Sequence, residues 1–215
     1  MTGTAQLVLT LGPLAVYLLS LGTWLAGRRS RVVAGWLDFA CLAFGLGGLL
    51  SFGPIGHFLV HTLFPGPSLY AWLALPSMLF LAVMLGLPRA SRRVVVYNIT
   101  PDRLAAAVSL AAAALSGDFR PTVRGFEDAA GHRGFVVDPS PRLRTAVLDA
   151  YGQQADDLAD SLARSLRREL QGVATGPAPL AWVWIGTAAL IVMVPLALRL
   201  ASRPQVRAML RSIWG

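Results

Sequence analysis

The chain has 215 residues, of which 55% are hydrophobic and 14% are charged, and its mean hydropathy is +0.58. A soluble domain usually carries roughly a quarter charged residues, so this composition indicates an integral membrane protein. The single cysteine, Cys41, excludes an internal disulfide and a cysteine-based metal cluster.

The net charge of +8 is concentrated outside the polar part of the sequence. Residues 90–176 hold eleven arginines and ten acidic residues, whereas the rest of the chain holds eight arginines and one acidic residue, Asp38. Arginines that flank apolar segments set membrane topology and meet anionic headgroups. The distribution therefore argues against DNA or RNA as a partner.

The first 92 residues predict three membrane-spanning helices, because about 20 apolar residues cross the roughly 30 Å hydrocarbon core of a bilayer. The apolar segments occupy about 6–26, 33–57 and 70–87, and the turn-forming sequence PGPS at 65–68 separates the last two. The first segment has neither a basic n-region nor a small-residue cleavage site, so we do not expect its removal as a signal peptide.

Residues 93–172 predict a small α+β domain of order β-α-β-β-(β)-α, inserted before the last span. The stretch VVVYNI is typical of a buried strand, and Thr100 followed by Pro101 is typical of a helix N-terminus. The next segment repeats apolar residues at helical spacing, so its apolar face should pack in one core with Val95. That face consists of Leu104, Val108, Ala111, Ala112 and Leu115.

The second half of this domain predicts a hairpin and a further helix. Strands at 122–126 and 134–138 flank the glycine-containing turn DAAGHRG. Residues 142–151 fit a strand by their alternation or a helix by their spacing, and the strand is favoured because the layer needs apolar partners. Leucines four residues apart, an acidic start and a basic end predict an amphipathic helix that contains Leu158, Leu162, Leu166 and Leu170.

Residues 173–215 predict a short linker, a fourth span at about 180–198, and an arginine-rich amphipathic tail in the membrane interface. The positive-inside rule assigns the arginine clusters at 28–31 and 89–93 to the cytoplasm. A multi-pass protein of the cell membrane then has its N-terminus outside and residues 93–172 in the cytoplasm. Four spans leave the basic tail outside, against the rule, so either the two clusters dominate or the last segment does not cross.

Asp38 is the first candidate for a functional residue within the membrane. A charged side chain in hydrocarbon costs at least ~2.5 kcal/mol unless it faces a partner or water. The alternative is that Asp38 lies at the cytoplasmic headgroup level and pairs with Arg29 or Arg31.

His57 and His61 are four residues apart, so on a helix they share a face and are weak candidates for a metal or haem iron. Two histidines supply at most half a coordination sphere and no third accompanies them, which favours ordinary interfacial hydrogen bonding. The glycosylation sequon at Asn98 ends a strand that we expect in the cytoplasm, so we expect no glycan there. A small-residue stripe predicts close helix packing through Gly45, Gly47, Gly48, Gly53 and Gly56.

The sequence contains no triad, paired-carboxylate cleft or phosphate-binding glycine loop that indicates catalysis or nucleotide binding. It therefore favours a non-enzymatic membrane protein whose cytoplasmic domain is an interaction or assembly module. The expected partners are the lipid bilayer and another membrane or cytoplasmic protein, without a cofactor. The alternative is a transporter subunit or membrane enzyme that uses Asp38 and the His57/His61 pair.

Overall fold

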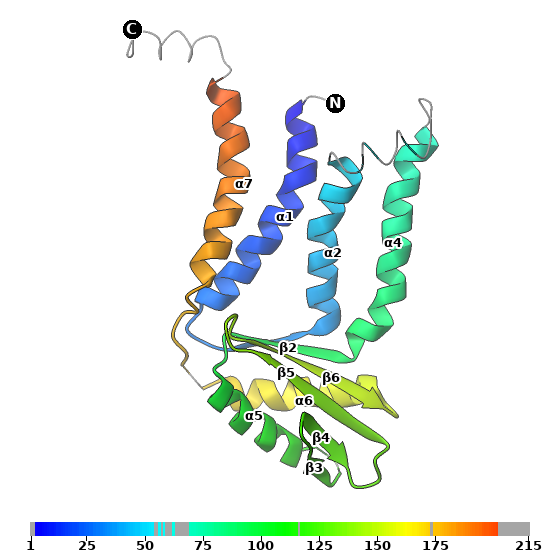
Figure 1. The fold of residues 1–215 in the computed structure, drawn as a ribbon, viewed down its shortest axis with the longest axis vertical. Helices are drawn as coiled ribbons and strands as arrows, with labels where there is room; N and C mark the ends of the chain where they lie inside the picture. Colours follow the sequence, from blue (N-terminus) through cyan, green and yellow to red (C-terminus); the bar gives the residue numbers. More distant parts are fainter. Residues whose placement is uncertain are drawn as a thin grey trace.

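The computed structural model describes residues 3–53, 56, 58, 62, 69–115, 117–172 and 174–201. These residues form a six-stranded sheet with helices on both sides, and the chain belongs to the α+β class (Figure 1). The long helices rise from one side of the sheet and are α1 (Gly3–Ala26), α2 (Gly35–Phe52), α4 (Leu69–Ser91) and α7 (Ala181–Ala201). The other side carries α5 (Pro101–Ala113) and α6 (Ala155–Leu170).

Two described helices, α1 and α2, are long and apolar enough to cross a membrane, at Leu7–Ala26 and Gly35–Phe52. Helices α4 and α7 cover the third and fourth expected spans, but their apolar stretches are shorter, at Pro76–Leu87 and Ala181–Ala197. The expected count of four spans is therefore not confirmed. His57, His61 and the tail at 202–215 lie outside the described residues.

All neighbouring strands of the sheet are antiparallel, in the order β1-β2-β6-β5-β4-β3. The order of elements between residues 93 and 172 is β-α-β-β-β-β-α, with one strand more than the sequence predicted. A further strand, β1, comes from the segment between α1 and α2. The strands are β1 (Arg31–Ala34), β2 (Arg93–Tyr97), β3 (Phe119–Pro121), β4 (Gly125–Asp128), β5 (Arg133–Ser140) and β6 (Thr145–Gly152).

Two strand predictions were wrong in detail. The strand expected at 122–126 begins only at Gly125, with β4. Residues 122–124 form a tight turn between β3 and β4, which the Thr122 N–H closes by donating to the Gly125 carbonyl at 2.8 Å. The sequence analysis also did not predict β1. Its four residues, RVVA, follow an arginine cluster and precede a long apolar segment, so they were assigned to those two features instead of to a separate strand. By contrast, the strand alternative for 142–151 and the hairpin around residues 129–132 are confirmed by β4, β5 and β6.

The first buried core lies between the sheet and helices α5 and α6. The residue pattern predicted for α5 is correct, since Leu104, Val108 and Ala111 are all buried there. Thr100 stands at the N-cap as expected, although its hydroxyl makes no capping hydrogen bond. The leucines of α6 enter the same core and meet fully buried side chains of the central strands, namely Val96, Phe135 and Leu148.

Val95 corrects the prediction of a single core. It lies in the same strand as Val94 and Val96, but its side chain points to the opposite face of the sheet, because successive residues of a strand alternate. There it packs with Leu25 at the end of α1 and Ala181 at the start of α7. From Val94 to Tyr97, β2 is therefore buried on both faces, which explains why this part of its sequence lacks charged residues.

Candidate functional site

Asp38 lies in the first turn of α2, directly after β1, and contacts the sheet. The Tyr97 hydroxyl donates a hydrogen bond to the Asp38 carboxylate, and the Tyr97 ring packs against Trp24 of α1 with the ring centroids 5.4 Å apart. Among the described residues the carboxylate thus pairs with Tyr97, and the ion pairs found there do not include the expected Arg29 or Arg31. Asp38 thus connects α2 to the sheet.

Burial raises the pKa of the Tyr97 hydroxyl above its ordinary value of 10.0, and the hydrogen bond to Asp38 and the negative charge of Asp38 raise this pKa further. The hydroxyl is therefore protonated at neutral pH and remains a donor. Only 4% of the Tyr97 surface is exposed, so the contact is shielded from water. This pairing gives Asp38 a partner that compensates its partial burial.

Asn98 joins three segments at the point where the helices meet the sheet. Its amide nitrogen donates to the Gly27 carbonyl at 2.7 Å and to the Thr175 hydroxyl at 3.0 Å. The main-chain carbonyl of Asn98 accepts a hydrogen bond from the Ser30 hydroxyl at 2.9 Å. The side chain is fully buried, so the sequon at this residue does not present an accessible acceptor.

Asn98 also has a left-handed backbone, with φ of 56°. Asparagine tolerates this conformation better than most residues, because its short polar side chain can form local hydrogen bonds. A single residue thus turns the chain out of β2 and binds both the segment that follows α1 and the segment that leads into α7. We call this arrangement of Gly27, Ser30, Asn98 and Thr175 the junction.

Backbone contacts extend the junction along the segment that leads to α7. The Thr175 N–H donates to the Arg28 carbonyl at 2.7 Å, and the Ala178 N–H donates to the Leu25 carbonyl at 2.9 Å. The Arg144 guanidinium donates to the Gly176 carbonyl at 3.0 Å. The segment expected to be a simple linker is therefore bound to the end of α1 and to the sheet.

The glycine stripe of α2 allows the long helices to approach each other closely. A Cβ atom added at Gly48 would lie 2.6 Å from the Leu9 carbonyl oxygen of α1, and one at Gly45 would lie 3.1 Å from Cβ of Tyr17. Small residues permit such contacts between membrane helices. Gly47 approaches Leu79 of α4 instead, so the glycine stripe allows α2 to pack closely against both α1 and α4.

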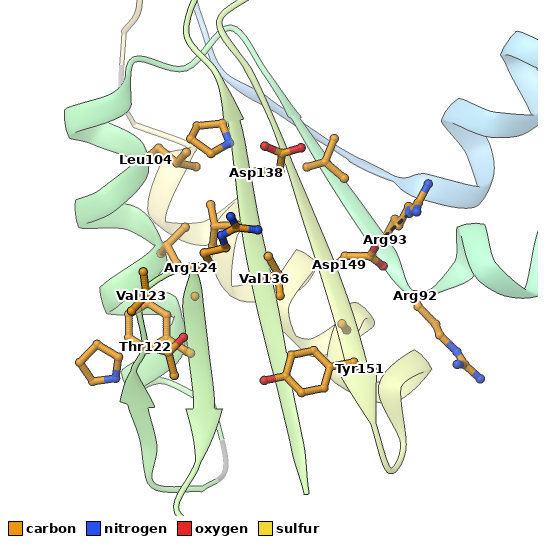
Figure 2. Close-up of a pocket in the computed structure, with 18 of the residues that line it drawn as sticks. Arg92, Arg93, Leu104, Thr122, Val123, Arg124, Val136, Asp138, Asp149 and Tyr151 are labelled. Carbon is orange, nitrogen blue, oxygen red and sulfur yellow. Dashed lines mark hydrogen bonds and ion pairs between the residues drawn. The ribbon is translucent and has the colours of Figure 1, made fainter. Parts of the chain in front are cut away.

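An open groove of about 1410 Å³ extends over the sheet from the end of α4 to the turn between β3 and β4, and side chains of α5, among them Leu104, also line it (Figure 2). Figure 2 shows Arg92 and Arg93 on one side of the groove and Arg124, from the turn between β3 and β4, on the other. Val136 lies between them on β5. The charged residues that line the groove are Arg89, Arg92, Arg93, Arg124, Asp138 and Asp149.

Two of these arginines have acidic partners. Nε of Arg93 lies 3.1 Å from Oδ2 of Asp149, and Nε of Arg92 lies 3.8 Å from Oδ1 of Asp156. For Arg89 and Arg124 the described residues include no acidic partner. The sequence did not reveal this groove, because the register that brings residue 124 to the sheet face beside α4 depends on long-range strand pairing.

The described residues contain no group of three or more histidine, cysteine, aspartate or glutamate side chains that could hold a metal ion. The weak metal candidates His57 and His61 are not among them, so that hypothesis stays a prediction. A comparison of the chain with protein-family models, curated proteins and solved structures gave no match.

Proposed function

We propose that the chain is a multi-span membrane protein that holds a non-enzymatic α+β interaction module in a fixed orientation at the cytoplasmic membrane surface. The module then serves the assembly of a membrane complex. The main support for this proposal is the junction, because its hydrogen bonds hold the module against the ends of α1 and α7. A flexible linker would instead leave the orientation of the module unconstrained.

The lengths and surfaces of the four long helices support membrane insertion. At about 1.5 Å per residue, the whole helices α4 (23 residues) and α7 (21 residues) extend about 35 and 32 Å, close to the ~30 Å hydrocarbon thickness, while their apolar stretches at Pro76–Leu87 and Ala181–Ala197 are shorter. The apolar windows of α1 and α2 are each only 22% buried, whereas the core helix of a soluble protein is mostly buried. Large apolar side chains are exposed on all four helices, among them Val16, Phe44, Leu85 and Leu190.

The arginine clusters support the cytoplasmic position of the module. Arg28 and Arg29 follow α1, and Arg89 and Arg92 lie at the end of α4, so both clusters occur where the long helices meet the sheet. Cytoplasmic segments are enriched in such residues. Three crossings before residue 93 then place the N-terminus outside.

Transport or catalysis through Asp38 is the alternative function. Asp38 lies in the first turn of α2, and its carboxylate accepts a hydrogen bond from Tyr97 of the sheet. This geometry favours a role in attachment, because the same hydrogen bond ties α2 to β2. Asp38→Asn preserves an acceptor oxygen for the Tyr97 hydroxyl, so it separates attachment from chemistry that needs a charge.

The topology is tested by reporter fusions at Gly3 and within the turn at 128–134. We expect the two reporters to lie on opposite sides of the membrane, with the turn in the cytoplasm. Reporters on the same side would contradict three crossings before the module, and a reversed pair would contradict the cytoplasmic assignment.

The assembly role is tested by affinity purification of the full chain in mild detergent. We expect a stoichiometric protein partner that the parent and Asp38→Asn retain. Leu104→Asp, which unfolds the module, should lose this partner, while Ala106→Asp on the exposed side of the same helix should keep it. A parent chain that elutes alone, or a partner that survives Leu104→Asp, would contradict assembly through the module.

A further inference from the structure

The sheet face opposite α5 and α6 is covered over only part of its width. At β1 and β2 its side chains are buried against α1 and α7, with Val33 and Val95 at 8% and 7% exposure. The strand register continues the same face from Val95 to Val147 and Asp138, and from Arg93 to Asp149 and Val136. On β5 this face is open, because Val136 is 37% exposed.

The open part of the face lies beside the end of a membrane helix. The apolar stretch of α4 ends at Leu87, and Arg89, Arg92 and Arg93 follow within six residues and line the groove. If the apolar part of α4 lies in hydrocarbon, these guanidinium groups lie at the level of the lipid headgroups. The groove therefore opens where phosphates of the bilayer are available.

The charges of the groove are complementary to an anion. Four arginines and two aspartates line it, so its formal balance is +2. Arg93 is engaged by Asp149, whereas Arg89 and Arg124 have no acidic partner among the described residues. Arginine binds phosphate through a planar fork of two N–H groups, which makes unpaired arginines at a membrane surface suitable phosphate ligands.

The uncharged lining fits a lipid better than a fully hydrated anion. Val136 and Val147 form part of the lining between the arginines, and Val123 at the turn is fully exposed. An apolar surface next to cations matches a headgroup together with the first carbons of its acyl chains. A free phosphate ion would leave this surface in contact with water.

We infer that the groove binds the phosphate-bearing headgroups of anionic phospholipids, with Arg89 and Arg124 as the arginines that are free to do so. This site rests on the membrane position of α4 in the proposed function, but it does not depend on a protein partner. Lipid bound there would occupy the open part of the sheet face and extend the contact between module and membrane that the junction begins.

The test is native mass spectrometry of the full chain in mild detergent, titrated with phosphatidylglycerol or with phosphatidylcholine of the same acyl chains. We expect preferential retention of phosphatidylglycerol by the parent. The double variant Arg89→Gln/Arg124→Gln should bind it roughly 25-fold more weakly, at about fivefold for each arginine near a membrane surface. Arg89→Lys/Arg124→Lys should recover part of the binding, because the charge remains while the fork is lost.

The matched control is Arg164→Gln/Arg168→Gln, which removes two exposed arginines from α6 on the other side of the sheet. We expect this variant to bind phosphatidylglycerol as the parent does. Equal retention of both lipids by the parent, an unchanged groove variant, or an equal loss in the control would each overturn the proposal. Competition by inorganic phosphate at the lipid's own concentration would assign the site to a free anion, and a co-purified protein that the groove variant releases would assign it to a protein.

Discussion

The two faces of the sheet differ in what covers them. One face packs against α5 and α6, which belong to the same continuous segment as most of the strands, and encloses the larger core. The other face packs against the ends of α1 and α7 through a smaller cluster that contains Leu25, Val95 and Tyr97. The first face therefore supports the fold of the module, while the second supports its attachment to the long helices α1 and α7.

The side chains of β2 contribute to both cores, so the two faces can be compared within a single strand. Val94 and Val96 are buried in the first core, and Val95 and Tyr97 are buried in the second. Since neighbouring residues serve different cores, substitutions one position apart should have different consequences. The following changes separate folding from attachment, and the largest expected effect comes first.

Leu104→Asp should unfold the module while the long helices stay inserted. It buries an unpaired charge in the first core, which costs several kcal/mol out of a typical domain stability of about 5–15 kcal/mol. Limited proteolysis of membranes should cleave residues 101–170 of this variant. Ala106→Asp, which places the same charge on the exposed side of α5, should resist protease as the parent does.

Leu25→Ala should loosen the attachment and leave the module folded. Leu25 is 1% exposed in the second cluster, and truncating a buried leucine costs about 2–5 kcal/mol. Protease should then reach the segments at 27–30 and 174–180, while residues 101–170 remain resistant. Leu19→Ala, at a 48% exposed position of the same helix, is the control and should change neither region. Cleavage throughout the module in Leu25→Ala would show that the two faces are not separable.

Asn98→Ala should weaken the junction by about 3–4 kcal/mol. It removes two side-chain hydrogen bonds, each contributing about 1 kcal/mol, and places alanine in a left-handed conformation that costs roughly 1–2 kcal/mol. Asn98→Gly loses the same bonds without the backbone strain, so its midpoint of thermal unfolding should lie between those of the parent and Asn98→Ala. Equal midpoints for the two variants would show that the backbone conformation is not a constraint.

Tyr97→Phe should have the smallest effect, about 1.5–3 kcal/mol, because it removes one hydrogen bond to a carboxylate. It should also change the pH dependence of attachment. The folded-state pKa of Tyr97 is raised, so the stabilisation is complete below pH 10.0 and is lost progressively as the pH rises above that value. Protease sensitivity of the junction should increase in the parent above pH 10.0 and be less pH-dependent in Tyr97→Phe.

The sequence predicted elements whose pattern is local and repeated. The leucines of α6 and the apolar face of α5 follow helical spacing, so their burial in the first core was foreseeable. The second core was not foreseeable, because it assembles Leu25, Val95 and Ala181, which are far apart in the sequence. Asp38 was identified as unusual, but its partner Tyr97 follows 59 positions later and depends on how β1 and β2 pair.

The turn at 122–124, which contributes to the groove, could not be predicted from local sequence either. TVR reads as the start of a β-strand, since threonine and valine favour strands. The hydrogen bond from Thr122 to Gly125 instead closes a turn there, and only this turn brings Arg124 into the groove lining. β-strand propensity therefore gave the wrong local structure at Arg124, a residue of the proposed lipid site.

The most direct test of this account is the distance of each side of the module from the lipid headgroups. Spin labels on Val136→Cys and, separately, on Arg164→Cys, both in a Cys41→Ala chain, report the open sheet face and the outer surface of α6. In nanodiscs that contain nickel-chelating headgroups, we expect strong paramagnetic broadening of the label at 136 and little at 164. Equal broadening at the two positions, or stronger broadening at 164, would contradict a module whose open sheet face is turned to the membrane.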